Sequence, residues 1–216
     1  MAYKAVMFDL DGTLLDTLQD LADSMNSVLD HFGFPIHQVE AYKYFVGGGM
    51  ENLARRALPE DQRDEVTVAQ CFAALMADYN QRWTKHTHTY PGVPELLDAL
   101  TTAGLRMAIL SNKPDDFSKK CVARVLPGWH FEKVVGVRPG GPIKPDPAAA
   151  LEIASDLGLP PAEFLYLGDT GTDMQTAAAA GMFPVGALWG FRTAEELTRS
   201  GARVLIARPT DLLELL

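Results

Sequence analysis

Short, continuously apolar runs alternate along most of the chain with segments of helical periodicity. Six runs are candidate strands: Tyr3–Phe8, Leu105–Leu110, Lys133–Val137, Phe164–Leu167, Pro184–Leu188 and Val204–Ile206. Runs without a polar face are typical of a parallel sheet that is covered on both sides. Helices are predicted between them, at Pro94–Ala103, Asp115–Leu126, Asp146–Leu157 and Asp173–Ala180. This alternation predicts an α/β fold with a doubly wound parallel sheet.

One segment of about 75 residues, 16–90, breaks the alternation. From Leu18 to Phe32 apolar residues recur every three or four positions, which predicts one apolar stripe on a helix that ends at Gly33. Further helical patterns follow at 39–46, 50–58 and 61–83, and no strand is predicted in this segment. We therefore predict a Rossmann-like core of residues 1–15 and 91–216, with a small α-helical domain inserted at 16–90.

The composition is typical of a soluble globular protein, because 47% of the 216 residues are hydrophobic and 22% are charged. The net charge of −9 argues against nucleic acid or an anionic membrane surface as a partner. The longest uncharged run, Met174–Phe191, is interrupted by glycine and proline and predicts no membrane span. Without a recognisable signal peptide, we expect a cytoplasmic protein whose Cys71 and Cys121 are buried and reduced. The oligomeric state, monomer or homodimer, stays open.

Polar side chains gather directly after three of the predicted strands. The first strand is followed by Asp9 to Thr13, the second by Ser111 to Lys113, and the fourth by Gly168 to Asp173. Ligands of open α/β sheets bind outside these carboxyl ends. Carboxylates that converge there repel one another unless a cation lies among them, and a hard, oxygen-binding ion such as Mg²⁺ suits this set. Each aspartate taken alone can equally be a turn or helix-capping residue, so the prediction depends on their joint occurrence in this order.

The chain resembles a phosphatase of the haloacid dehalogenase superfamily over its whole length. The four motifs of that superfamily correspond to Asp9-Leu10-Asp11-Gly12-Thr13, to Ser111, to Lys144, and to Asp169 with Asp173. The helical insertion corresponds to the small α-helical cap of that superfamily. The phrases DLDGTLLDT at 9–17, SNKP at 111–114 and WGFR at 189–192 are similar to the phosphoglycolate phosphatase branch. Many relatives have serine where this chain has Thr170, but threonine keeps the hydroxyl, so we expect the same chemistry.

The resemblance implies a Mg²⁺-dependent hydrolase of 2-phosphoglycolate or a similar small phosphorylated metabolite. Asp9 would form an aspartyl-phosphate, and Asp11 would act first as general acid and then as the base that activates water. The implied metal ligands are Asp9, the backbone carbonyl of Asp11, Asp169 and Asp173. Phosphate contacts are expected from Leu10, Gly12, Thr13, Ser111 and Asn112, those near Leu10 and Gly12 through backbone N–H groups. Lys144 would add positive charge at the phosphoryl oxygens and balance the carboxylates.

Several further residues allow two interpretations. Gly47-Gly48-Gly49 precedes a helix and is either a hinge or an anion-binding helix start; we assign Gly48 and Gly49 to the candidate substrate site. His86 and His88 lack a third metal ligand and are expected to be exposed loop residues. Trp189 and Phe191 either line a pocket, pack in the core or form a contact between domains.

Two other functions stay open from the sequence. A sugar-phosphate mutase would use the same four motifs and hand the phosphoryl group to a second hydroxyl instead of to water. A non-enzymatic phospho-accepting signalling domain would share the acidic Mg²⁺ pocket, but it would lack the helical insertion and leave Asp11 without a task. A dehalogenase is disfavoured because that branch does not use an acid two residues after the nucleophile. A phosphonatase would need a cap lysine, and nothing singles out Lys43 for that role.

Overall fold

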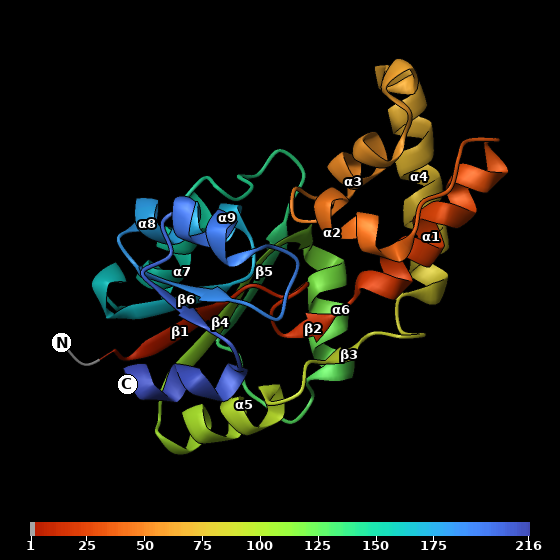
Figure 1. Cartoon of the computed structure of the whole chain (residues 1–216). Helices are drawn as coiled ribbons and strands as arrows, with labels where there is room; N and C mark the ends of the chain where they lie inside the picture. Colours follow the sequence, from red (N-terminus) through yellow and green to blue (C-terminus); the bar gives the residue numbers. More distant parts are fainter. Residues whose placement is uncertain (1–2) are drawn as a thin grey trace.

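The computed structural model describes residues 3–216, and its centre is a six-stranded parallel sheet (Figure 1). The strand order is β5-β4-β1-β6-β7-β8. The strands are β1 (Ala5–Phe8), β4 (Arg106–Pro114), β5 (Lys133–Val137), β6 (Phe164–Gly168), β7 (Phe183–Ala187) and β8 (Val204–Ile206). In the register of the sheet, Ala5 of β1 lies opposite Arg106 of β4 and Phe164 of β6. The strand order runs outward from β1 in both directions, which confirms the predicted doubly wound fold.

Helices cover both faces of the sheet. As a result, all four residues of β1 are buried. Val6 and Phe8 pack on the side of α5 (Val93–Thr102), α6 (Asp115–Val125) and the 3₁₀ helix η4 (Pro209–Leu215). Ala5 and Met7 pack on the opposite side, with α7 (Ala148–Asp156) and α8 (Gly171–Ala180). The short helix η3 (Pro161–Glu163) precedes β6, and α9 (Ala194–Arg199) contacts β7 and β8. The core therefore has three layers, helix on sheet on helix.

The segment between β1 and α5 is mostly helical and forms a compact unit beside the sheet (Figure 1). It contains α1 (Leu18–His31), η1 (Val39–Ala41), α2 (Tyr42–Phe45), α3 (Met50–Ala57), η2 (Glu60–Gln62) and α4 (Glu65–Arg82), which we call the helical unit. The apolar stripe predicted for α1 is buried from Leu18 to Leu29. Phe117 of α6 and Phe191 of the loop after β7 join the apolar cluster of the helical unit. The two units therefore share a packed interface.

Two corrections fall in segment 16–90. Leu15–Asp16 (β2) and His88–Thr89 (β3) pair as antiparallel strands, so the expectation of no strand in segment 16–90 is wrong. Two-residue strands carry too few positions for an alternation to be recognised. The last helix of the helical unit begins at Glu65 rather than near residue 61, because the Asp64 side chain accepts the N–H groups of Val66 and Thr67 and caps it.

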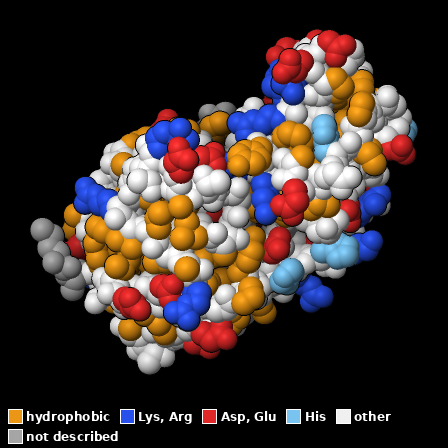
Figure 2. All heavy atoms as spheres, viewed as in Figure 1, with side chains coloured by type: hydrophobic (Ala, Val, Ile, Leu, Met, Phe, Trp, Pro, Cys, Tyr) orange, Lys and Arg blue, Asp and Glu red, His pale blue; other side chains and the backbone are white. Residues whose placement is uncertain are grey.

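Other expectations concern the protein as a whole. Cys71 and Cys121 are buried and free. Within residues 3–216 no helix has both the length and the hydrophobicity needed to cross a bilayer. On the face shown in Figure 2, acidic and basic side chains are interspersed rather than segregated. The domain boundaries at 15/16 and 90/91 stay predictions.

Candidate active site

The polar residues predicted at the strand ends lie together in the structure. Asp9 follows β1, Ser111 to Lys113 lie in the last part of β4, and Asp169 follows β6. The strand β4 runs to Pro114, past its predicted end at Leu110, because it continues to pair with β5 there. Since β4, β1 and β6 are parallel neighbours, their carboxyl ends meet at one edge of the sheet. This edge is the place where an α/β protein of this topology binds its ligands.

Three buried carboxylates form the centre of the site. Asp9, Asp169 and Asp173 each offer one oxygen, and these oxygens lie within 4.8 Å of one another. The ammonium of Lys144 lies among them, 2.8 Å from Asp9 Oδ1 and 2.7 Å from Asp173 Oδ1, and donates to the carbonyl of Leu110 at 3.0 Å. One ammonium against three carboxylates leaves an excess of negative charge. A divalent cation would neutralise this excess.

The protonation of these groups reflects their burial and mutual repulsion. Burial, followed by the charge of Asp173, holds the pKa of Asp9 well above its ordinary value, although Lys144 opposes the shift. Burial and then Asp173 also raise the pKa of Asp169 to about 7. Burial alone would lower the pKa of Lys144, but the carboxylates of Asp173 and Asp9 raise it well above its ordinary value. The side chains therefore suit a site that releases protons when it takes up a metal ion.

Two donors orient Asp169. The Thr13 hydroxyl donates to Oδ1 at 2.9 Å, and the backbone N–H of Phe191 donates to Oδ2 at 2.8 Å. The indole N–H of Trp189 in turn donates to the carbonyl of Thr13 at 2.9 Å. Gly12 has a φ of +88° and lies where a Cβ would collide with the Asp169 carboxylate, so only glycine suits this position. In this structure Thr13 thus orients a candidate metal ligand; its predicted phosphate contact stays a prediction.

Asp173 serves two purposes through its two oxygens. Oδ2 accepts the N–H and the hydroxyl of Thr170 at 3.0 and 2.6 Å, in the capping box that begins α8. Oδ1 faces Lys144. The capping and metal-binding interpretations of this aspartate are therefore compatible, and the hydroxyl of Thr170 donates one of the two hydrogen bonds that hold Oδ2.

Asp11 lies apart from the three-carboxylate cluster. Its Oδ1 and Oδ2 lie 2.9 and 3.1 Å from Nζ of Lys113, and the same Nζ donates to the hydroxyl of Tyr79 on α4 at 2.9 Å. The sequence motifs predict no role for Lys113 or Tyr79. The two-residue spacing between Ser111 and Lys113 is a usable signal, since alternate residues of a strand point to the same face. The sequence holds no comparable signal for Tyr79, which comes from the helical unit.

The side chain of Asn112 links three segments. Its Nδ2 donates to the carbonyls of Gly47 and Lys144, each at 3.0 Å, and its Oδ1 accepts the N–H of Lys144 at 2.8 Å. Both amide hydrogens are therefore engaged with the protein, whereas the sequence predicts that they bind phosphate. Asn112 thus connects the glycine loop (Gly47–Gly49) of the helical unit to the loop that carries Lys144. Phosphate binding by Asn112 stays a prediction.

The other predicted phosphate donors differ in their availability. The backbone N–H of Gly12 is donated to the carbonyl of Leu15 at 2.9 Å. Leu10 is fully buried, and its carbonyl accepts the N–H of Leu15 at 2.9 Å. Ser111 Oγ accepts the N–H of Lys113 at 3.2 Å, a contact that does not use its hydroxyl hydrogen. Ser111 is therefore the side chain best prepared to donate to a phosphate oxygen.

A small cavity lies between the sheet edge and the helical unit. Its volume is about 30 Å³, which is room for only a few water molecules. Polar side chains of the core and apolar side chains of the helical unit line it: Asp9, Asp11, Ser111, Asn112 and Lys113 on one side, Leu21, Val46, Met50 and Leu53 on the other. Gly47 and Gly49 complete the wall. Gly48 faces two neighbouring surface pockets instead.

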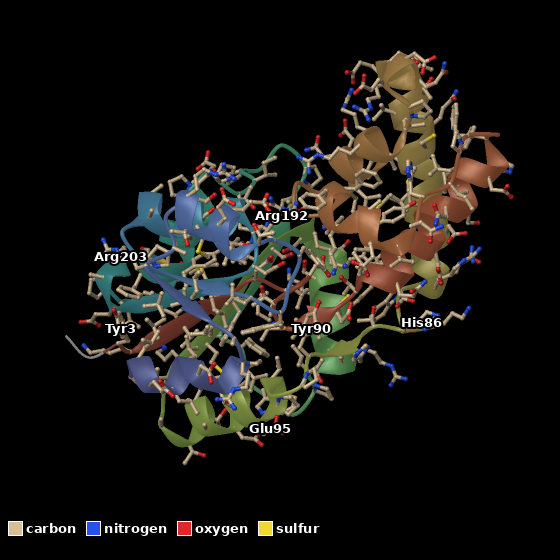
Figure 3. The ribbon with its side chains drawn as sticks, in the orientation of Figure 1. Tyr3, His86, Tyr90, Glu95, Arg192 and Arg203 are labelled. Atoms are coloured by element: carbon tan, nitrogen blue, oxygen red, sulfur yellow. The ribbon has the colours of Figure 1, made fainter. Side chains whose placement is uncertain are left out.

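Arg192 joins the core to the helical unit. Its guanidinium donates to the carbonyl of Val46 at 2.9 Å and lies 5.1 Å from the centre of the Tyr44 ring. Figure 3 shows it at the junction between the two units. His86, which Figure 3 places on the opposite side of that junction, and His88 are exposed, as expected.

Known proteins share both the sequence and the fold of this chain. Residues 6–187 match the family of haloacid dehalogenase-like hydrolases. The chain is 34% identical over 207 residues to a phosphoglycolate phosphatase from Pseudomonas syringae pv. syringae (strain B728a), which covers 94% of this chain and 76% of that protein. It is 30% identical over 213 residues to a phosphoglycolate phosphatase from Aquifex aeolicus. That alignment covers 99% of this chain and 96% of the relative. A crystal structure from Lactobacillus delbrueckii subsp. bulgaricus, provisionally named a phosphoglycolate phosphatase, superposes with a TM-score of 0.93 at 30% identity and covers 100% and 98%.

The chain therefore belongs to the haloacid dehalogenase-like hydrolases. Within that family it is a phosphatase, similar to phosphoglycolate phosphatases. This confirms the resemblance seen in the motifs and decides against the non-enzymatic signalling domain.

Proposed function

We propose that the protein hydrolyses a small phosphomonoester, with 2-phosphoglycolate as its best substrate, and that the reaction requires Mg²⁺ and passes through an aspartyl-phosphate on Asp9. The observation that carries the proposal is the placement of Asp9 at the end of β1, buried beside Lys144 and within reach of two further carboxylates. The names of the relatives support the choice of 2-phosphoglycolate.

The buried carboxylates suit Mg²⁺ by their chemistry. Asp9, Asp169 and Asp173 offer only oxygen donors, which hard cations prefer over the nitrogen and sulfur donors typical of zinc sites. Together with the backbone carbonyl of Asp11 they would hold the ion. When bound, the ion supplies positive charge that reduces the repulsion between an anionic nucleophile and an anionic phosphate.

The contacts of Asp9 prepare it as the nucleophile. Its backbone N–H donates to the carbonyl of Leu167 at 2.9 Å, which anchors the residue to β6. Lys144 holds Oδ1, which leaves Oδ2 to attack phosphorus. The bond from Oδ2 to phosphorus forms as the bond from phosphorus to the ester oxygen breaks, and the alcohol departs.

Asp11 serves both halves of the reaction. It lines the same cavity as Asp9 and follows it by two residues. In the first half it donates a proton to the departing ester oxygen. In the second it accepts a proton from the water that attacks phosphorus, which releases inorganic phosphate and restores Asp9. The Ser111 hydroxyl donates to a phosphoryl oxygen throughout.

Substrate binding requires the helical unit to move. The cavity, of about 30 Å³, has room for only a few water molecules. The side chains of Leu21, Met50 and Leu53 must therefore withdraw from the sheet edge and then close on the substrate. Closure excludes bulk water from the site, which strengthens the electrostatic contacts there.

A panel of phosphomonoesters assayed with Mg²⁺ tests the proposal. We expect 2-phosphoglycolate to have the highest kcat/KM, and activity to disappear with EDTA and return with Mg²⁺. A ranking led by another ester rejects the substrate, and conversion of a hexose phosphate to its isomer without release of phosphate identifies a mutase. Rapid quenching and mass spectrometry should find one phosphoryl group on the wild-type protein and none on Asp9→Asn.

A further inference from the structure

A second cavity lies on the other side of the glycine loop from the catalytic one. Its volume is about 280 Å³. The helical unit contributes Gly47, Gly48 and Arg56 to its wall, and the core contributes residues of α9, of the first turn of α8 and of the loop between β7 and α9. Of the described residues, Gly47 alone lines both cavities. The mechanism proposed above assigns no ligand to this second cavity.

The cavity is positively charged in a protein whose net charge is −9. Arg56, Arg192 and Arg199 line it together with one acidic residue, Glu196. The carboxylate of Glu196 already accepts the N–H and the hydroxyl of Thr193, each at 3.3 Å, in the capping box of α9. Three guanidinium groups against one engaged carboxylate leave an excess of positive charge, which attracts anions.

Two of the guanidinium groups flank consecutive residues of the glycine loop. A Cβ at Gly47 would lie 3.6 Å from Nη2 of Arg192, and a Cβ at Gly48 would lie 3.6 Å from Nη2 of Arg56. Burial lowers the pKa of Arg192 and the charge of Arg56 adds to the shift, whereas the charges of Asp169 and Glu196 oppose it. An anion between the two arginines would therefore relieve a repulsion that the protein maintains without it.

The arginines are held in place and still have hydrogens to donate. Arg56 Nη1 donates to the carbonyl of Tyr44 at 3.1 Å, and Arg192 donates to the carbonyls of Lys43 and Val46. A guanidinium carries five N–H donors, so these bonds to the described residues use fewer than half of them in each side chain. The planar fork of arginine matches the oxygens of a phosphate group.

We propose that this cavity binds a phosphate group, either as inorganic phosphate or as the phosphate end of a small metabolite. The bound anion contacts Arg56 of the helical unit and Arg192 and Arg199 of the core. Because these arginines lie on opposite sides of the junction at which Figure 3 shows Arg192, the anion also stabilises the contact between the two units. The site is separate from the catalytic one and does not depend on the proposed reaction.

Isothermal titration of the metal-free protein in EDTA tests the site, at an ionic strength kept constant with KCl. Without metal the catalytic carboxylates repel a further anion. We expect one inorganic phosphate per chain, with a dissociation constant of about 1 mM or lower. A second titration uses 2-phosphoglycolate. Tighter binding of the ester assigns the cavity to a phosphorylated metabolite, and tighter binding of phosphate assigns it to the free ion. Absence of binding by both overturns the inference.

Arg56→Met and Arg199→Met each remove one charge, the first from the helical unit and the second from the core. Both side chains are exposed, so the fold should tolerate the substitutions. Each should weaken phosphate binding about 10-fold, because each deletes a charge-assisted contact. Wild-type affinity in both variants would place the phosphate elsewhere, and a loss in only one of them would show that the anion does not join the two units. Either result overturns the inference.

Arg63→Met and Arg124→Met are the matched controls. Arg63 belongs to the helical unit and donates to the carbonyl of Leu58 at 3.0 Å, and Arg124 is an exposed arginine of α6. Neither lines the cavity, so both variants should bind phosphate with wild-type affinity. If they lose as much affinity as Arg56→Met, phosphate responds to the net charge alone and the site does not exist.

Thermal unfolding in EDTA adds a second measurement. A ligand that binds only the folded protein raises its melting temperature. Phosphate should therefore raise the melting temperatures of the wild type and of both controls, and raise those of Arg56→Met and Arg199→Met much less. Equal increases in all of these proteins would mean that phosphate acts outside the cavity, which also overturns the inference.

Discussion

Lys144 Nζ lies 2.8 Å from Asp9 Oδ1, so the candidate nucleophile is paired with a cation that is itself almost fully buried. We expect Lys144→Met to lower kcat/KM by at least roughly 10²-fold, because charge that meets the phosphoryl group is lost. Without metal it should destabilise the fold by about 3–5 kcal/mol, since buried carboxylates lose their partner. Enzyme assays and denaturant unfolding measure the two effects.

Lys133→Met is the control for this substitution. Lys133 is a half-exposed lysine paired with Asp156 at 2.7 Å, and exposed ion pairs contribute only about 0–1 kcal/mol. Equal effects of the two substitutions would show that Lys144 has no special place in the site.

Asp9 and Asp11 should have separable roles. Asp9→Asn should form neither phosphoenzyme nor product, because the attacking oxygen is gone. Asp11→Asn should lose roughly 10²–10⁴-fold with alkyl esters. With p-nitrophenyl phosphate it should release a burst of p-nitrophenolate and then accumulate aspartyl-phosphate, since activation of water fails. Rapid-quench kinetics with mass spectrometry follow both steps. Wild-type turnover by Asp9→Asn would refute the mechanism.

The carboxylate cluster should make stability depend on pH and metal. The pKa of Asp169 is about 7 in the folded protein, against an ordinary value of 3.8, because of burial and then the charge of Asp173. The folded protein therefore holds a proton between about pH 4 and 7 that the unfolded chain releases, so this residue lowers stability as pH rises through that window. Mg²⁺ requires the ionised form, so its apparent affinity should rise as the pH rises through that window.

Asp169→Asn isolates this effect in thermal unfolding between pH 5 and 8. Without metal, its melting temperature relative to that of the wild type should increase by a few degrees as pH rises, since about 1 kcal/mol corresponds to about 2–4 °C at this size. Mg²⁺ should raise the melting temperature of the wild type and not that of the variant. A difference between the two proteins that stays constant with pH would contradict the assignment.

Gly190 should be intolerant of a side chain for reasons of space alone. A Cβ there would overlap the Asp169 side chain, so Gly190→Ala must displace a candidate metal ligand. We expect weaker Mg²⁺ binding by isothermal titration and a loss of about 1–3 kcal/mol in stability, as for an overpacked core. Gly128 has open space around its Cβ position, and Gly128→Ala should change neither quantity.

Local sequence patterns were sufficient to predict much of the fold of this protein. The buried runs of β1 and β6 and the stripe on α1 depend on the periodicity of consecutive residues, so the sequence predicts the sheet and the helical unit. The convergence of Asp9 and Asp169 follows as well, because both come directly after neighbouring parallel strands. The short pair β2 and β3 escaped prediction because two residues carry no periodicity.

The finer arrangement of the site depends on packing between distant segments. Tyr79 meets Lys113 across 34 positions of sequence, and Arg192 meets Val46 across 146. The amide group of Asn112 can donate to phosphate oxygens or to protein carbonyls. In the structure the glycine loop lies close enough for Asn112 to donate to the carbonyl of Gly47. The residue types and their order therefore determine which groups reach the sheet edge. How those groups are paired is determined by the closure of the helical unit on the core, because a hydrogen bond depends on distances that no local pattern encodes.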